Sequence, residues 1–522
     1  LQLYSHAPPL LAGFETKHQP TVTMNQRVHL HSNALISSLL QLTPSERAAR
    51  LETLVLEHVV SVGGQLEVGL DEPLMEAGLD SLAAIELTNQ LSQSLGDGVV
   101  LSATALFDHP TVSQLAAHIG SLLCWEEPVE AHAVQLAVVP HGDASVQESL
   151  MVAGAGCVSP GASNNSAKFW CVLSNAVDPI CGVPSGRWDQ RQHAESSEQV
   201  GGSKCYVQCG GFVAGLEGFD NTHFRISASE AKQMDPQQRA VLEVCLVCLN
   251  LRRIDCLWWL QVGYQAVQVA GQSKQKLLGS ATGVFVGLAG GEFAALPNKS
   301  EAGPYTATGG HAAIASNRVS YVLGLEGPSI SVDTACSSAI VALDTACHSL
   351  HSGACIQALV GTVNALLSVG GFVGTCKAHM LSARGHCHTF EASADGYVRA
   401  EGCCAVFIQT ASSVGAVQVA STSLNQDGRT ANLTSPNGPA QQRVIARALQ
   451  LAVVQGSELP LVDCHGTGTA LGDPIEVSAQ RAVLGQGRRE ADPLVMGAVK
   501  SSVGHLEAGA GLVGVLKLVL AL

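Results

Sequence analysis

The residue best suited to covalent chemistry in this chain is one cysteine. Cys336 ends a segment that begins at Ser329 and is typical of a β-strand, and an amphipathic helix follows. A thiol at such a strand-to-helix turn points along the helix axis, where the helix dipole favours the thiolate. The position therefore predicts a nucleophile that needs no metal for its activation. The alternative is an inert buried cysteine, which is our interpretation of the other sixteen among the 17 cysteines.

Two histidines occupy similar positions further along the chain. His465 follows the apolar pair Leu461 and Val462 and precedes Gly466, so we expect it at a strand end beside flexible glycines. His505 comes shortly after Lys500 in a second segment of the same kind. Taken singly, each histidine is also compatible with a loop residue whose hydrogen bonds are satisfied.

Ser81 is the second candidate for covalent chemistry. It stands in Gly-Leu-Asp-Ser-Leu at 78–82, where a helix is expected to begin. The hydroxyl could simply cap the helix. It could also be an attachment point, because the positive end of a helix stabilises a phosphodiester.

The elements around Ser81 predict a small helical bundle. Thr43 and Glu46 form a capping-box pattern, and the helix that they start is expected to stop at Gly63. A second helix begins near Ser81, and a third opens at Thr111. The apolar positions expected to face inward on these last two helices are Ala84, Leu87, Leu91, Leu95, Leu115, Ile119 and Leu122. Residues 124–147 are acidic and contain proline, which indicates a linker.

From residue 148 onward the chain has the pattern of an α/β fold. Short apolar runs alternate with helical stretches; these runs are 283–287, 330–332, 358–360, 405–408 and 461–462. The composition agrees, with 46% hydrophobic residues, 14% charged residues and 54 glycines among 522 residues. A net charge of −15 without basic runs argues against nucleic acid or an anionic membrane as partner. No apolar stretch reaches the roughly 18–20 residues of a spanning helix, so we expect a cytoplasmic protein, with a plastid as alternative.

The N-terminal part resembles a known carrier family. The helical bundle, its spacing and the Phe-Asp-His-Pro-Thr segment at 107–111 are similar to an acyl carrier protein over residues 35–123. The resemblance implies that Ser81 carries 4′-phosphopantetheine, donated by coenzyme A through a phosphopantetheinyl transferase.

The part from 148 to 522 resembles the β-ketoacyl synthase (ketosynthase) family of modular type I polyketide synthases. Its motifs appear in order: Cys-Ser-Ser at 336–338, His-Gly-Thr-Gly-Thr at 465–469 and Lys-Ser-Ser-Val-Gly-His at 500–505, with supporting matches at 234–239, 393–397, 425–428 and 435–440. The resemblance implies the thiolase-like layered α/β/α/β/α fold, a homodimer and an acyltransferase of the 3-oxoacyl-[acyl-carrier-protein] synthase type. It implies that Cys336 holds the acyl chain while His465 and His505 donate hydrogen bonds to the enolate of a decarboxylated malonyl thioester. Lys500 would be a supporting charge.

The sequence departs from this family in three places. Residues 245–262 interrupt an expected continuous helix, and we interpret them as a retained intron or mistranslated segment, with a tolerated surface loop as alternative. Cys245, Cys248 and Cys256 within this insertion are a weak zinc pattern, and we expect no metal site. The chain ends at Leu522, before the glycine-rich segment that closes the family's fold, so we expect the ketosynthase to be incomplete. Ser502 replaces the usual asparagine.

Three alternative functions follow from the same motifs. A type I fatty acid synthase carries the same domains, and only neighbouring domains would distinguish it. A degradative thiolase would need a second catalytic cysteine in place of a histidine and no fused carrier. A truncated synthase could be inactive and act only as an acyl carrier or binder. Residues 1–34 remain unassigned, and malonyl loading is expected from another synthase domain such as an acyltransferase.

Overall fold

The computed structural model describes residues 34–63, 68–75, 77–79, 81–96, 101, 105–123, 149–194, 204–249, 274–294, 296, 303–410, 417–489 and 491–522. The chain forms two compact units, Leu1–Ala131 and His132–Leu522, which are described separately below. The predicted linker 124–147 lies outside the described residues, and so does the unassigned segment except for Ala34.

The first unit is a small helical bundle, as predicted. Its helices are α1 (Ala34–Leu40), α2 (Pro44–Gly63), α3 (Ser81–Leu95), α4 (Ala105–Asp108) and α5 (Val112–Leu122). The capping box at the start of α2 is confirmed, because the Thr43 N–H donates to Glu46 Oε2 over 2.9 Å and the Glu46 N–H donates to Thr43 Oγ1 over 3.4 Å. Thr111 caps α5 by accepting from the Gln114 N–H over 3.2 Å.

One predicted core position in this bundle is wrong. Leu122 is 41% exposed, whereas its neighbour Leu123 is buried at 2% exposure and continues the inward face of Leu115 and Ile119 at a spacing of four residues. The other predicted inward positions are buried, and the apolar core also takes in Ile36 of α1 and Leu106 of α4. The sequence interpretation contained neither α1 nor α4, because helices of this length carry less than two turns of periodicity.

The second unit is built on a six-stranded mixed sheet. The strand order is β5 (Ser329–Val332), β4 (Thr282–Leu288), β6 (Gln357–Asn364), β7 (Gly402–Thr410), β1 (Leu150–Val158) and β8 (Val417–Val419). The first three strands are parallel, and each of the remaining strands is antiparallel to its neighbour. All five apolar runs predicted as strands are confirmed. Four of them lie in this large sheet, and the fifth lies in β9 (Leu461–Asp463), which pairs with β10 (Val495–Gly497) in a separate two-stranded parallel sheet.

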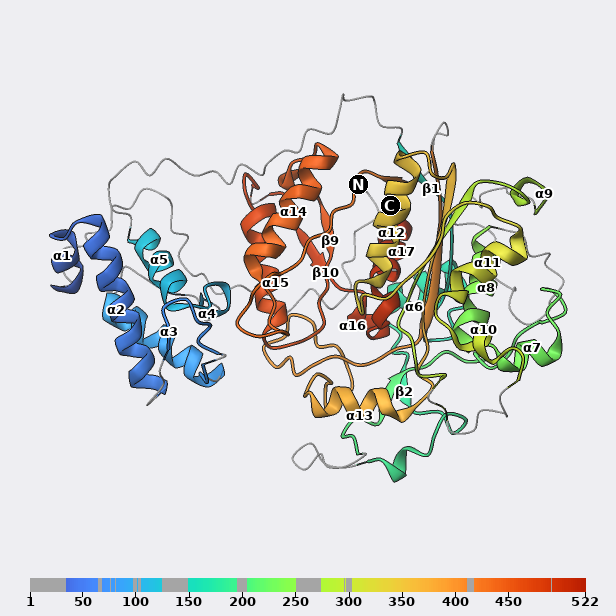
Figure 1. Ribbon diagram of the computed structural model, residues 1–522, viewed down its shortest axis with the longest axis horizontal. Coiled ribbons are helices and arrows are strands. Elements are labelled where there is room, and N and C mark those ends of the chain that lie inside the picture. The colour runs from blue at the N-terminus through green and yellow to red at the C-terminus, as the bar shows by residue number, and fades with distance from the viewer. Residues whose placement is uncertain are drawn as a thin grey trace. The chain divides into compact units, whose positions relative to one another are not determined.

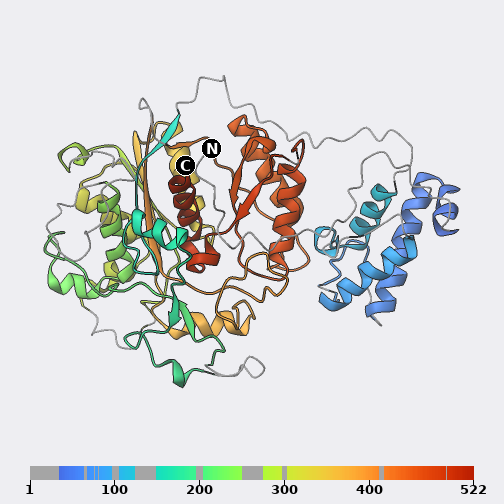
Figure 2. The ribbon, with the colours of Figure 1, turned by 180° about the vertical axis from the view of Figure 1, so that it is seen from behind.

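Five layers follow one another across this unit (Figure 1). Helices α8 (Pro236–Cys248) and α11 (Ile314–Leu323) cover one face of the large sheet, and α6 (Ser166–Ser174), α12 (Ser338–His351) and α17 (Ala510–Ala521) cover the other. Beyond α12 and α17 lies the β9–β10 sheet, which is covered in turn by α14 (Gly438–Ala452) and α15 (Gly472–Leu484). The same order is visible from behind in Figure 2, and it is the predicted α/β/α/β/α arrangement.

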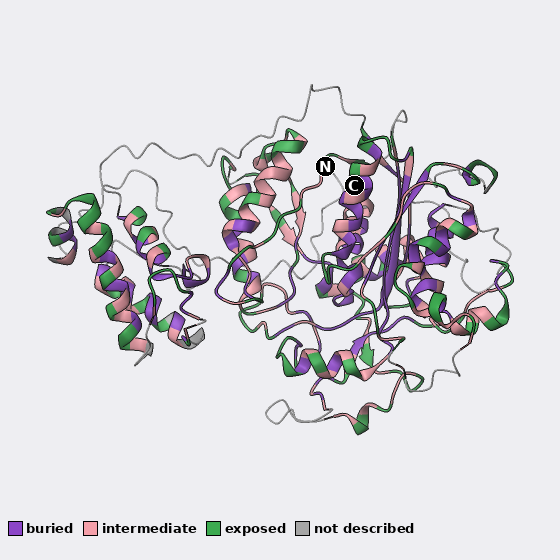
Figure 3. Cartoon of the chain, viewed as in Figure 1, coloured by how far each residue is buried: buried purple, intermediate pink, exposed green. Residues whose placement is uncertain are grey.

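The large sheet is buried on both faces (Figure 3). Successive side chains of β4 alternate, so that Phe285 joins the core beneath α12 and α17 while Val284 and Val286 join the core beneath α8 and α11. This double burial explains why the central strands are continuous apolar runs. The large sheet holds the turn after β5, where Cys336 lies, while His465 follows β9 of the smaller sheet and His505 follows α16.

The remaining elements are short or lie at the edges of the layers. They are β2 (Ile180–Gly182), η3 (Gln190–Gln192), β3 (Cys209–Gly211), α7 (Ala228–Gln233), α9 (Lys274–Leu277), α10 (Thr306–Gly310), α13 (Val369–Lys377), η4 (Gly456–Glu458), α16 (Lys500–Val503) and η5 (Glu507–Gly509). Within the described residues, no helix is both long and apolar enough to cross a bilayer.

The first residues of the predicted insertion 245–262 continue α8. Cys245 and Cys248 are helical and buried, with 1% exposure each, so this part of the segment is not a surface loop. Residues 250–262 lie outside the described residues.

Candidate active site

Cys336 lies in a tight turn between β5 and α12. Its neighbour Ala335 adopts the left-handed backbone conformation, with φ of 54°. Hydrogen bonds hold this turn: the Ala335 N–H donates to Asp333 Oδ1 over 3.1 Å and the Thr334 N–H donates to Ser338 Oγ over 2.8 Å. The turn brings Cys336, which is exposed, to the beginning of α12.

His465 follows β9 directly and is fixed through its backbone. The two oxygens of Glu476, on α15, accept from the His465 N–H over 2.6 Å and from the Gly466 N–H over 2.8 Å. Gly466 has φ of +45°, and a Cβ there would lie 2.5 Å from the Cβ of Ala498. Glycine is therefore required beside this histidine.

His505 follows α16 and pairs with the segment that precedes β7. Its N–H donates to Val398 O over 2.8 Å, and its carbonyl accepts from the Ala400 N–H over 2.9 Å. The ring of Tyr397 packs edge-on against the His505 ring, with centroids 5.0 Å apart. Buried to 4% exposure, His505 is the most enclosed of the three candidate groups.

The fold brings these three side chains together from distant parts of the chain. The Cys336 Sγ and one nitrogen from each of His465 and His505 all lie within 4.8 Å of one another. The two imidazole rings are nearly perpendicular, at 89°, with centroids 5.9 Å apart. A thiol and two ring nitrogens are thus close enough together to act on one reacting group.

One backbone hydrogen bond determines which nitrogen of His505 carries the proton. The Glu507 N–H donates to His505 Nδ1 over 3.0 Å, so Nδ1 must be the acceptor and Nε2 must carry the hydrogen of the neutral ring. A metal ion would need the Nε2 lone pair, which this tautomer does not offer. The arrangement therefore suits a hydrogen-bond donor and argues against a metal ion held by these three residues.

Both rings are neutral at physiological pH. The protein around the His465 ring lowers its pKa to about 3, with the nearby Lys500 ammonium contributing to the same shift, although the residue is exposed at the surface. Burial also holds the pKa of His505 well below its usual value, with additional repulsion from Lys500, His465 and Arg399. Neutral imidazoles that keep their N–H can donate hydrogen bonds to a developing oxyanion.

Lys500 lies behind the two histidines. Its ammonium donates to the His465 carbonyl over 2.5 Å, and the residue is only 4% exposed. Burial lowers the pKa of Lys500, and the Glu476 carboxylate opposes that change. Lys500 is thus a buried residue that contacts His465 and whose charge acts on Cys336, as expected for a supporting charge.

The ionisation of Cys336 differs from the sequence expectation. Protein packed around the thiol raises its pKa above the ordinary value, although Lys500 opposes the rise, and Glu507 adds to it. The thiol is therefore the main form at neutral pH. Although the residue is exposed at the surface, the protein atoms around the sulfur raise the pKa by more than the Lys500 charge lowers it, a tertiary effect that the local strand-to-helix pattern does not report.

Ser81 is the first residue of α3, and its side chain lies outside what the structure describes. The preceding Leu79 is buried, so the start of this 15-residue helix is anchored in the bundle core. A primary hydroxyl at an anchored helix start fits a phosphopantetheine group, which is attached through a phosphodiester. The group would supply a mobile thiol for thioesters.

Sequence reasoning missed the carboxylates and the arginine that surround the site. Glu476 and Glu507 fix the two histidines, and the buried Arg399 pairs with Glu507. Arg399 comes two residues after the motif at 393–397, next to the apolar residues Val398 and Ala400. A charge in such a stretch is a signal for a buried ion pair, but its partner cannot be read from spacing.

Comparisons with known proteins agree with this geometry. The family described as Beta-ketoacyl synthase, N-terminal domain, matches residues 147–257 and 254–413, and its C-terminal domain matches residues 416–522. The family described as Phosphopantetheine attachment site matches residues 55–119, which include Ser81.

Individual relatives point in the same direction. The chain is 35% identical over 526 residues to polyketide synthase GfsA of Streptomyces halstedii, covering 98% of this chain and 7% of that protein. It is 39% identical over 507 residues to mycoketide-CoA synthase of Mycobacterium tuberculosis, covering 94% of this chain and 11% of that protein. The chain thus spans only a small part of the curated relatives that it matches.

A solved structure shows the same likeness. The oxazolomycin ketosynthase domain OzmH KS7 of Streptomyces albus superposes with a TM-score of 0.63 at 32% identity, covering 72% of this chain and 63% of that one. The chain therefore belongs to the β-ketoacyl synthase family, and it joins a phosphopantetheine carrier domain to a ketosynthase, an acyl-transferring condensation enzyme.

Proposed function

We propose that Cys336, His465 and His505 carry out a decarboxylative Claisen condensation on thioester substrates. The observation that supports this best is the meeting of one thiol and two neutral imidazoles within 4.8 Å. A thiol can exchange acyl groups with a thioester at little cost in bond energy. Two neutral N–H donors can stabilise an enolate oxygen, each for about 3–4 kcal/mol of barrier.

In the first step Cys336 attacks the carbonyl carbon of an incoming acyl thioester. The new carbon–sulfur bond to Cys336 forms as the bond to the donor sulfur breaks, and the released thiolate takes the Cys336 proton. Because the Cys336 pKa is raised, this step speeds up as the pH rises. Lys500 supports it, because its positive charge lowers the Cys336 pKa.

In the second step a malonyl-type thioester loses carbon dioxide. The electron pair of the broken carbon–carbon bond passes to the thioester oxygen, where His465 and His505 donate hydrogen bonds. The enolate carbon then attacks the acyl carbonyl on Cys336, a carbon–carbon bond forms, and the cysteine leaves as thiolate and regains a proton. Lys500, hydrogen-bonded to the His465 backbone, positions that histidine and keeps it neutral.

We further propose the partners that this chemistry requires. A phosphopantetheinyl transferase would modify Ser81, and another synthase domain such as an acyltransferase would load the malonyl unit. We also propose a homodimer through the ketosynthase. Its β5 is an edge strand of the large sheet, and Ile330 of this strand is 38% exposed, as is Tyr321 of α11 at 87%. An exposed edge with apolar side chains can pair with a second chain.

We propose a cytoplasmic location because both relatives named above are bacterial, which offers no support for a plastid.

The boundaries 35–123, 124–147 and 148–522 and the insertion 245–262 remain proposals as well. Sequencing the mature transcript tests the insertion: message that retains the codons for 245–262 rules out an artefact of splicing or translation.

Peptide mass spectrometry tests the proposed function directly. The purified chain is incubated with coenzyme A, a promiscuous phosphopantetheinyl transferase and a simple acyl thioester. We expect the Ser81 peptide to gain the phosphopantetheine mass and the Cys336 peptide to gain the acyl mass, and Ser81→Ala and Cys336→Ala each to lose only their own modification. An acyl group on other cysteines but not on Cys336 would contradict the assignment.

A further inference from the structure

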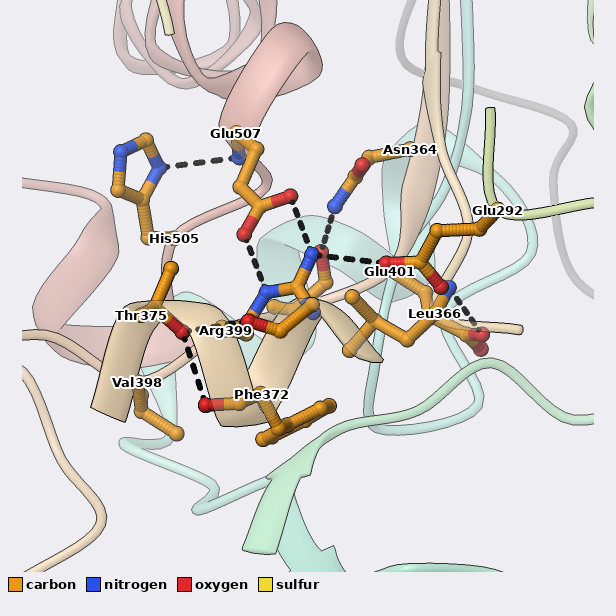
Figure 4. A network of polar contacts seen from close by, with 12 residues as sticks. Glu292, Asn364, Leu366, Phe372, Thr375, Val398, Arg399, Glu401, His505 and Glu507 are labelled. Atoms are coloured by element: carbon orange, nitrogen blue, oxygen red, sulfur yellow. Dashed lines mark hydrogen bonds and ion pairs between the residues drawn. The ribbon is translucent and has the colours of Figure 1, made fainter. Parts of the chain in front are cut away.

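A buried arginine, Arg399, contacts Glu507, the residue whose N–H donates to His505 (Figure 4). Arg399 is 5% exposed and grips both carboxylate oxygens of Glu507, with Nε to Oε1 at 2.5 Å and Nη2 to Oε2 at 2.9 Å. The same Nη2 also contacts Glu292 Oε1 over 3.1 Å. The paired contact to Glu507 is the planar two-bond geometry that only arginine provides.

Glu507, which Arg399 holds like a clamp through these two hydrogen bonds, has a strained backbone. Glu507 adopts φ of +44°, a left-handed conformation that a residue with a side chain rarely adopts. Such a conformation persists only where surrounding contacts hold it. The N–H of this same residue donates to His505 Nδ1 and so keeps the hydrogen of the ring on Nε2. The strain is therefore located at the atom that determines the His505 tautomer.

Arg399 is itself held rigidly. Its guanidinium lies 5.0 Å above the centroid of the Phe372 ring. The second oxygen of Glu292 accepts from the N–H groups of Leu367 and Ser368, over 2.8 Å and 2.9 Å, which ties the clamp to the chain after β6. Glu507 is thus connected to the end of β6 through Arg399 and Glu292, and these contacts restrict its movement.

Arg399 is poorly suited to a purely stabilising role. Its Nη1 is buried and finds no hydrogen-bond partner among the described residues. Leaving a buried donor unpaired is unfavourable, and a buried ion pair often stabilises a fold no better than apolar side chains would. The arrangement makes sense if the geometry that it imposes on Glu507 is what matters.

We propose that Arg399 is a positioning residue for the condensation: by clamping Glu507 in its strained conformation, it holds the Glu507 N–H on His505 Nδ1 and so keeps His505 as an Nε2–H donor. The inference rests on the proposed function, because the donor matters only if an enolate oxygen forms there. Acyl transfer to Cys336 depends on the thiol and does not need this tautomer. Loss of the clamp should therefore separate the two half-reactions.

The test compares Arg399→Lys with Arg318→Lys as a matched control. Arg318 is another buried arginine, 7% exposed, whose ion pair with Glu230 at 2.6 Å links α11 to α7 in a different layer of the fold. The rate of Cys336 acylation is read by peptide mass, and single-turnover release of labelled carbon dioxide from a malonyl thioester is read on the acylated chain. We expect Arg399→Lys to slow carbon dioxide release about 10²-fold, the effect of losing one oxyanion donor, with acylation changed less than threefold. Arg318→Lys should leave the ratio of the two rates unchanged.

A double-mutant cycle separates positioning from general damage. Glu507→Gly retains the N–H and accepts a positive φ without strain, so it removes the need for a clamp. In the Glu507→Gly background, Arg399→Lys should therefore slow carbon dioxide release by less than tenfold. An equally large effect of Arg399→Lys in both backgrounds would overturn the proposal.

A readout independent of activity completes the test. Hydrogen exchange at the carbon between the two ring nitrogens of His505, followed by peptide mass at fixed pH, should become several-fold faster in Arg399→Lys and stay unchanged in Arg318→Lys. Unchanged exchange in Arg399→Lys would refute the clamp even if the wild-type chain showed no condensation. A wild-type chain that neither acylates Cys336 nor releases carbon dioxide, yet shows the expected exchange difference, would refute the proposed function and support the clamp.

Discussion

Replacing Lys500 with methionine isolates the effect of its charge on the candidate site. The substitution keeps the length of the side chain and removes the ammonium that lowers the pKa of the Cys336 thiol and of both histidines. We therefore expect all three pKa values to rise. For Cys336 the sign is clear: a higher pKa leaves less thiolate at neutral pH, so acylation slows at pH 7 and recovers as the pH is raised.

The size of the effect follows from two opposing terms. Each unit by which the Cys336 pKa rises reduces the thiolate fraction about tenfold, while the intrinsic nucleophilicity of the thiolate rises about threefold, since its Brønsted slope is about 0.4–0.5. The net loss at pH 7 is about threefold for each unit. Above the new pKa the variant should match or exceed the wild type.

The assay is the pH profile of Cys336 acylation between pH 6 and 10, with Lys517→Met as the control. Lys517 is another partly buried lysine, paired with Asp463 Oδ1 at 2.6 Å, whose charge acts on Cys464. We expect the Lys500→Met profile to move to higher pH and the Lys517→Met profile to stay in place. A Lys500→Met profile that is lowered by a constant factor without moving would refute the electrostatic reasoning.

Three further predictions concern local structure. Ala335→Val should destabilise the turn before Cys336 by about 1–3 kcal/mol and abolish acylation, because a β-branched residue fits poorly at φ of 54°. Ala335→Gly should retain acylation. Thermal unfolding measures the stability of each variant, and peptide mass measures its acylation. Leu87→Ala in the fully buried core of the carrier unit should lower its unfolding free energy by about 2–5 kcal/mol, measured by urea titration of that unit's transition. Burial lowers the pKa of His109 to about 4, aided by its stacked neighbour His118. Between about pH 6.5 and 4 the unfolded chain therefore binds more protons than the folded one, so the carrier unit should lose stability as the pH falls through that window. His109→Phe should weaken this pH dependence in melting curves recorded from pH 7 to 4.5.

Local sequence patterns were sufficient where the structure depends on local physics. The capping box at Thr43 and Glu46 and the stripe from Ala84 to Leu95 predicted α2 and α3, because caps and periodicity act within a few residues of the chain. The apolar runs also predicted β4, β6 and β7, because strands buried on both faces need apolar side chains at most positions. The shorter runs in β5 and β9 were sufficient as well, although these two strands are only partly buried. Leu122 was predicted incorrectly because a spacing of three or four residues from Ile119 allows either Leu122 or Leu123 to face inward, and the structure buries Leu123.

The candidate site shows the limit of that approach. Family motifs identified Cys336, His465 and His505, but no local pattern places them within 4.8 Å of one another or reveals that Glu507 determines a tautomer. The expected activation of Cys336 relied on the helix dipole, a local effect. The direction of its pKa shift depends on the protein atoms that the fold packs around the sulfur, and no local sequence pattern reports them.

The pKa values of the two histidines match the chemistry that they would perform. An enolate must be stabilised long enough to form a carbon–carbon bond, and a protonated imidazole beside it would donate its proton and destroy the nucleophile. A neutral ring donates a hydrogen bond but gives up its proton reluctantly, as other enzymes exploit when they polarise a carbonyl with a neutral histidine. Burial and the Lys500 ammonium both lower the pKa of His465 and His505, so the same charge that helps the Cys336 thiolate also keeps both donors neutral. One buried lysine thereby serves the acyl-transfer step and the condensation step through a single electrostatic field.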